Sequence, residues 1–255
     1  MAQLEFALRN EALSVLSVML LAGASASAHA AEPSRALPAG PSFVAHFALE
    51  VSGGPNTPID RSSGRLLFGS DGEACLRVDH PQRQEFAMRA NGLTVLYLDE
   101  GLLARSGVRD QGLPPMLDAL VAGLASPARA LPSSSRLVEQ KRVGDVLVSR
   151  WQLPQASGLG AEVAISEGVE GARKVVFRDV KGLELRSYAF SGRQRLGAVT
   201  VPLRVQAVYR RAKGGAIARQ ESWTLKDMRA PTAADPSMAA CARPAPGARI
   251  REVTW

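Results

Sequence analysis

Apolar and polar residues alternate with a period of two along most of the chain, which is the pattern of β-strands that bury one face. In Phe43–Val51 the odd positions hold Phe, Ala, Phe, Leu and Val, whereas His46 and Glu50 stand at even positions. Similar segments follow at 64–68, 73–80, 83–90, 93–99, 136–143, 145–153, 161–166, 173–180, 184–191, 201–212 and 216–229. Strands in succession with hairpin-length connections predict an antiparallel meander.

Turn residues separate these segments, and the period changes once. Asp71-Gly72, Asn91-Gly92 and Lys181-Gly182 are typical of tight hairpin turns. Residues 113–124 instead place their apolar side chains at helical spacing, after two prolines that a helix start tolerates. The sequence therefore predicts a mainly β protein: a strongly curved antiparallel sheet, an incomplete barrel of about eleven strands, with one helix or more covering its concave face.

The concave face of such a sheet predicts a ligand cavity. An antiparallel sheet can have one apolar and one solvated face, and a single helix is a thin cover for about eleven strands. An apolar cavity suits acyl chains, because each buried CH₂ contributes about 0.8 kcal/mol. Ordinary core packing is the alternative for every residue of the predicted lining. That lining consists of Phe47, Leu49, Phe68, Val78, Phe86, Met88, Tyr97, Leu117, Leu120 and Trp151.

The N-terminal 30 residues have the features of a secretory signal peptide. An uncharged apolar run at Leu13–Leu21 precedes small residues and Ala28-His29-Ala30, so cleavage is expected near Ala30. The run is shorter than the roughly 20 residues that span a bilayer, and no Leu-x-x-Cys lipobox accompanies it. We therefore expect a periplasmic protein with a flexible lead-in at 31–41, a sheet domain at 42–230 and an irregular tail at 231–255.

Charge and composition narrow the function further. The chain has a formal net charge of +7, with 31 basic and 24 acidic residues. Export and the lack of a basic run interleaved with aromatic residues disfavour nucleic-acid binding. The basic excess is compatible either with arginines spread over exposed strand faces or with attraction to anionic lipid headgroups.

The two cysteines, Cys75 and Cys241, raise the question of a disulfide. An exported protein is in a compartment that permits one. Cys75 falls on the strand face opposite Leu76 and Val78, so a pairing would fasten the tail across the outside of the sheet. Two unrelated thiols are the alternative. Two cysteines without added histidines cannot form a structural zinc site, and we expect neither a metal nor a cofactor.

Catalytic motifs are not found in the sequence. Gly69-Ser70-Asp71-Gly72 is not a G-x-S-x-G elbow, because its serine directly follows the first glycine. His46 lies on the polar face of its predicted strand, and His80 stands at a strand end before Pro81. Gly158-Leu159-Gly160 lacks the third glycine and the helix of a dinucleotide fingerprint. The sequence predicts a protein that is not an enzyme.

Several short motifs stand in a recognisable order. They are Ser42–Phe47 (SFVAHF), Ser63–Phe68 (SGRLLF), Asn91–Tyr97 (NGLTVLY), Val201–Val205 (VPLRV) and Glu221–Asp227 (ESWTLKD). Together, over residues 42–230, they resemble the periplasmic lipoprotein carriers of the LolA/LolB-like superfamily. The resemblance implies a half-barrel that binds an acylated lipoprotein or another lipid, works as a monomer and exchanges cargo with inner- and outer-membrane transfer proteins.

The chain also departs from that family, which keeps other functions open. Gly69-Ser70 stands where the family has Arg-Pro, implicated in closing the lid. A relative that carries glycolipid or other acyl ligands for a membrane exporter is one alternative. An envelope-stress sensing module of the same fold is another, and a hydrolase is a third.

Overall fold

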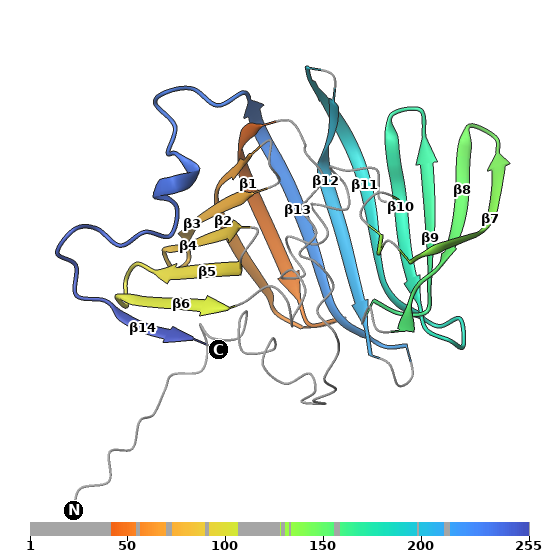
Figure 1. Ribbon diagram of the computed structural model, residues 1–255, viewed down its shortest axis with the longest axis horizontal. Helices are drawn as coiled ribbons and strands as arrows, with labels where there is room; N and C mark the ends of the chain where they lie inside the picture. Colours follow the sequence, from red (N-terminus) through yellow and green to blue (C-terminus); the bar gives the residue numbers. More distant parts are fainter. Residues whose placement is uncertain are drawn as a thin grey trace, which may run out of the picture. The chain divides into compact units, whose positions relative to one another are not determined.

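The alternating segments form strands, and the strands form one sheet (Figure 1). The computed structural model describes residues 42–54, 57–69, 73–89, 92–106, 128, 131–132, 134–155, 159–197, 199–211 and 215–254. Within them the sheet has 14 strands. Their bounds are β1 Phe43–Ser52, β2 Ile59–Phe68, β3 Ala74–His80, β4 Gln84–Arg89, β5 Gly92–Tyr97, β6 Leu102–Ser106, β7 Arg136–Val143, β8 Val146–Gln152, β9 Glu162–Gly168, β10 Gly171–Arg178, β11 Glu184–Leu196, β12 Val199–Arg210, β13 Ile217–Arg229 and β14 Arg251–Thr254.

The order of the strands confirms the predicted meander. Across the sheet they run β14-β6-β5-β4-β3-β2-β1-β13-β12-β11-β10-β9-β8-β7. Strands β1 to β6 and β7 to β13 each pair with their chain neighbours in antiparallel fashion, and the two runs join where β1 pairs with β13. Phe47 lies opposite Leu225 at this junction. The sheet is open, with β14 and β7 at its edges, so it is an incomplete barrel.

Three details differ from the sequence-based expectation. Strand β6 was not predicted, because five residues give too short an alternation to recognise. The tail, for which an irregular path was predicted, contains a short 3₁₀ helix at Met238–Ala240 and ends in β14. Strand β14 pairs with β6 in parallel, the exception to the antiparallel pattern. The predicted helix at 113–124 lies outside the described residues.

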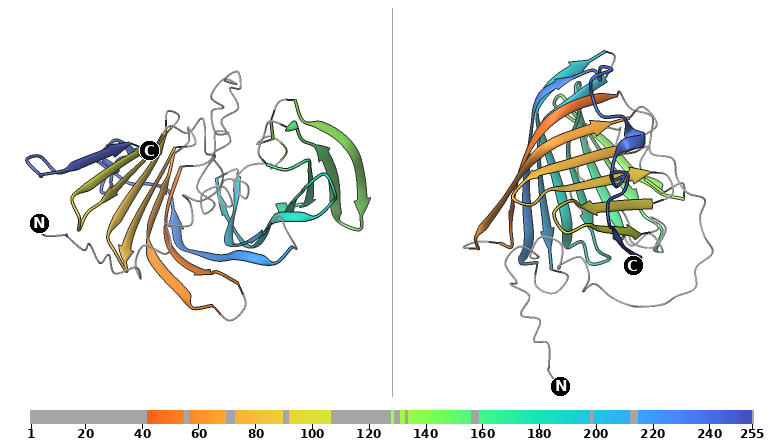
Figure 2. Two further views of the ribbon diagram at one scale, coloured as in Figure 1. Left: turned by 90° about the horizontal axis from the view of Figure 1, so that it is seen from below. Right: turned by 90° about the vertical axis from the view of Figure 1, so that its left-hand side faces the viewer.

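The sheet curves strongly, and the C-terminal tail runs along its convex side (Figure 2). The tail covers a small second core, in which Ala87, Leu96 and Leu103 pack with Cys75, Cys241 and Ala242. Polar contacts fix the same segment. Arg89 donates to the carbonyl oxygens of Met238 and Cys241 at 3.1 Å each, and the Ala242 N–H donates to the Glu85 carboxylate at 2.9 Å.

Residues that alternate with this covered set point to the concave side. On β3, Cys75 belongs to the core beneath the tail, whereas Ala74 and Leu76 point the opposite way, as successive residues of a strand do. Because directly opposite residues in neighbouring strands share a face, the register extends this assignment across the sheet. The Cys75–Cys241 disulfide, with its Cα atoms 5.9 Å apart, therefore lies on the convex side.

Candidate ligand-binding face

The pairing of directly opposite residues shows that one apolar face extends across the central strands of the sheet. Leu49 of β1 lies opposite Trp223 of β13, Trp223 lies opposite Val205 of β12, and Val205 lies opposite Phe190 of β11. All four side chains are buried and point to the concave side. Four neighbouring strands thus share one continuous apolar surface.

The residues that the sequence predicts as a lining fall on this concave face wherever the structure describes them. Six are buried: Phe47, Leu49, Phe68, Val78, Phe86 and Met88. Tyr97 of β5 and Trp151 of β8 are half-buried on the same face. Leu117 and Leu120 lie outside the described residues. The alternation therefore identified a shared face, and whether that face binds a ligand stays a prediction.

Aromatic side chains contact one another along this face. The rings of Phe47 and Trp223 have centroids 5.5 Å apart, and those of Phe43 and Phe68 stack at the same separation. Such pairs stabilise a fold beyond the area that they bury. On β5, burial raises the pKa of the Tyr97 hydroxyl to about 12.

Polar side chains gather at one end of the same face, and the sequence analysis did not single them out. Glu221 of β13 is fully buried and accepts hydrogen bonds from Arg219 Nε at 2.7 Å and from Trp223 Nε1 at 3.3 Å. On β11, the guanidinium of Arg186 lies 4.2 Å from the centre of the Phe177 ring. The sequence could have indicated that Arg219, Glu221 and Trp223 share a face, because they are spaced two residues apart along a predicted strand.

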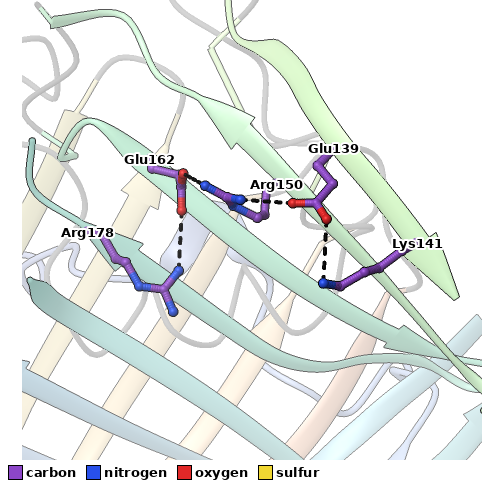
Figure 3. A network of polar contacts seen from close by, with 5 residues as sticks. All are labelled: Glu139, Lys141, Arg150, Glu162 and Arg178. Carbon is purple, nitrogen blue, oxygen red and sulfur yellow. Dashed lines mark hydrogen bonds and ion pairs between the residues drawn. The ribbon is translucent and has the colours of Figure 1, made fainter. Parts of the chain in front are cut away.

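The convex side carries a second candidate, an open groove of about 640 Å³ over β7 to β10. Three of its lining residues, Arg150, Glu162 and Arg178, belong to a chain of ion pairs (Figure 3). Arg150 donates to Glu139 at 2.8 Å and to Glu162 at 2.6 Å, and Glu162 also accepts from Arg178 at 3.3 Å. Lys141 completes the chain on Glu139 at 3.4 Å. These charges bind one another, so the network ties four strands together and offers a ligand little that is not already engaged.

The two histidines considered for catalysis do not belong to the buried part of the concave face. His46 alternates with Phe47 and so points to the convex side, and both His46 and His80 are exposed. In the described part of the chain, no group of three or more His, Cys, Asp or Glu side chains is arranged to hold a metal ion. Among those same residues, no helix is long and apolar enough to cross a membrane.

Solved structures share this sheet. A LolA superfamily protein from Nitrosomonas europaea aligns with a TM-score of 0.54 and 14% identity, over 76% of this chain and 87% of that chain. A domain described as an outer membrane lipoprotein-sorting protein, from Vibrio parahaemolyticus, gives 0.55 and 12%, over 76% and 87%. A DUF1329 family protein from Desulfovibrio piger gives 0.52 and 11%, over 78% and 89%.

These comparisons define the class of fold. At such low identities the likeness shows the architecture alone, and the chain has a LolA-like fold. No protein-family model matches the sequence, and no curated protein matches it.

Proposed function

We propose that this protein is a non-catalytic carrier in the periplasm that holds the acyl chains of a lipoprotein or another lipid against the concave face. One observation carries the proposal: a continuous apolar face runs through the centre of an open sheet whose fold is shared with a lipoprotein-sorting domain. Acyl chains suit such a surface, because their transfer from water needs no polar partner.

The rest of the carrier cycle belongs to the same proposal. A secretory signal at 1–30 delivers the chain to the periplasm, and a monomer takes its cargo from an inner-membrane donor and passes it to an outer-membrane acceptor. The uncatalysed exchange follows from the chemistry of the face, since transfer of an acyl chain between two apolar surfaces breaks no covalent bond. The open edges of the sheet favour such exchange over permanent enclosure.

A quenching experiment tests the binding face directly. Trp151 and Trp223 both point to the concave side, and Trp255 is the remaining tryptophan of the chain. In a Trp255→Phe background freed of co-purified lipid, a brominated fatty acid should quench the fluorescence in a saturable manner at micromolar concentration. Its unbrominated parent should compete. Absence of saturable quenching and of competition would contradict the carrier.

A pair of variants on one strand separates the two faces of the sheet. Val78 of β3 is buried on the concave face, whereas Arg77, its neighbour, points to the convex side and is exposed. Val78→Phe should weaken fatty-acid binding by occupying space on that face, and Arg77→Gln should leave it unchanged. Circular dichroism verifies that both variants are folded. Equal affinities for both would place the ligand elsewhere.

A further inference from the structure

We infer that the concave face has a built-in anchor for an anionic headgroup, so that the cargo is an amphiphile with a carboxylate or phosphate at its polar end. The inference rests on the proposed function and names the ligand class for the same face. It comes from a row of side chains across three central strands: Arg186 of β11, Tyr209 of β12 and Arg219 of β13.

The register places these three side chains in line. Arg186 lies directly opposite Tyr209, and Tyr209 lies directly opposite Arg219, so all three share the concave face. Adjacent strands are about 4.8 Å apart, which puts the two arginine backbones about 10 Å apart. Arginine side chains are long enough for both guanidinium groups to reach a single anion above the tyrosine ring. The phenol between them adds a hydroxyl donor.

Neighbouring residues contact the two guanidinium groups. Arg219 is held by the fully buried Glu221, with Nε donating to the carboxylate at 2.7 Å. Arg186 lies with its guanidinium carbon 4.2 Å from the centre of the Phe177 ring of β10, within the range of cation–π attraction, so it must turn from β10 toward Tyr209 to share an anion with Arg219. A planar guanidinium offers paired donors that match carboxylate and phosphate oxygens.

The row stands at one end of an apolar track. Along β13 the concave-face residues change from Arg219 and Glu221 to Trp223 and Leu225. Strand β11 repeats the gradient, with Arg186 followed by buried Tyr188 and Phe190. The three side chains of the row are half-buried, whereas Glu221 and the apolar residues beyond it are buried. Figure 1 shows β11, β12 and β13 side by side in the middle of the sheet. Such a gradient matches the length of an amphiphile, with its headgroup at the row and its chain along the track.

The chemistry of the row is also costly to maintain, which favours a role in binding. Removing charged groups from water costs several kcal/mol per ion unless partners compensate. Glu221 compensates Arg219, but binding of acyl chains alone needs neither arginine, whereas a guanidinium suits recognition of an anion. Charge-assisted hydrogen bonds from arginine are about twice as strong as neutral ones.

The test compares ligands that share a chain and differ in charge. Oleate is measured against oleyl alcohol, and oleoyl lysophosphatidate against monooleoylglycerol, by displacement of a fluorescent fatty acid. The anionic member of each pair should bind about tenfold or more tightly. Inorganic phosphate alone should compete weakly, and equal competition by phosphate and lysophosphatidate would overturn the amphiphile in favour of a free anion.

Variants assign the preference to the row. Arg186→Gln should remove most of the preference for anionic ligands and leave the affinity for oleyl alcohol unchanged. Arg204→Gln is the matched control, because Arg204 lies on the neighbouring strand β12 but is exposed and points to the convex side. Tyr209→Phe, which keeps the ring, provides a second variant if Arg186→Gln does not fold, and it should reduce the preference by a smaller factor.

The outcomes separate this inference from the proposed function. Equal binding of the charged and neutral ligands would contradict the headgroup anchor but not the proposed carrier function. Binding of none of the ligands would end both. A preference that survives Arg186→Gln and Tyr209→Phe would show that the row does not recognise the headgroup.

Discussion

Cys75 on β3 and Cys241 in the C-terminal tail are joined by a disulfide, with their Cα atoms 5.9 Å apart and a sequence separation of 166. The bond lies on the convex side, beneath the tail, within an apolar core that includes Ala87, Leu96 and Leu103. The tail thus covers part of the outer face, and the concave face opposite remains separate from this contact. The disulfide fastens the tail to β3.

Removing the disulfide should destabilise the protein without changing its concave face. For a closed loop of this length the double variant Cys75→Ala/Cys241→Ala should lose about 2–5 kcal/mol in the free energy of unfolding. Urea unfolding of the oxidised protein and the variant measures the loss. Limited proteolysis should cut the variant first within residues 231–250. Two reactive thiols per chain in the denatured, unreduced protein would contradict the pairing.

Gly64 should tolerate no side chain. A Cβ at this position of β2 would overlap the backbone carbonyl oxygen of Arg77 on β3, which no side-chain movement can relieve. Gly64→Ala should therefore cost about 3 kcal/mol or more, because the two strands must separate. Gly53→Ala is the control, since its Cβ would make an ordinary 3.6 Å contact with the Thr57 side chain. Thermal unfolding of both variants tests this prediction. Equal melting temperatures for Gly64→Ala and Gly53→Ala would contradict the proposed overlap at Gly64.

Acid should weaken the ion-pair network on the convex side. The hydrogen bond from Arg150 holds the pKa of the Glu162 carboxyl below its usual range. A carboxyl whose pKa is lower in the folded state stabilises fully above its unfolded pKa of about 4.3 and loses this effect as the pH falls through the folded value. Glu162→Gln should cost about 0.5–1 kcal/mol at pH 7, and the difference should vanish near pH 2.

A surface pair provides the comparison for this prediction. Glu50 binds Arg61 at 2.9 Å, but both side chains are at least half exposed. Glu50→Gln should therefore change the unfolding midpoint in urea less than Glu162→Gln at pH 7. A difference between wild type and Glu162→Gln that grows on acidification would show the opposite sign of linkage.

The fold could be predicted from the sequence because burial follows the alternation of apolar and polar residues along each strand. Phe47 and Leu49, Phe86 and Met88 are spaced two apart, and each pair is buried on the concave face. Alternation says which residues share a face of one strand, and hairpin order says which strands are neighbours. Neither feature gives the register between β1 and β13, because most of the chain separates these two strands in the sequence. That junction sets Leu49 beside Trp223.

The polar row escaped sequence analysis for a related reason. Arg186, Tyr209 and Arg219 come from three strands, and each alone resembles an exposed residue of an arginine-rich chain. Their common face depends on the register of β11 against β12 and of β12 against β13. Residue type also argued against burial, because a glutamate such as Glu221 is almost never fully buried unless it is paired. Its partner, two residues away, becomes apparent in the folded strand.

Removing one partner of the buried Arg219–Glu221 pair should destabilise the protein more than replacing both partners by apolar residues. Glu221→Leu would leave the Arg219 guanidinium without the carboxylate that it now contacts at 2.7 Å, so we expect a loss of about 3–5 kcal/mol in unfolding free energy. The double variant Arg219→Met/Glu221→Leu exchanges both charges for apolar groups and should lose less than Glu221→Leu alone. Urea unfolding of the two single variants and the double variant closes a cycle whose coupling energy reports the interaction. Single-variant losses that simply add in the double variant would show that the two side chains stabilise the sheet independently, with no coupling through the ion pair.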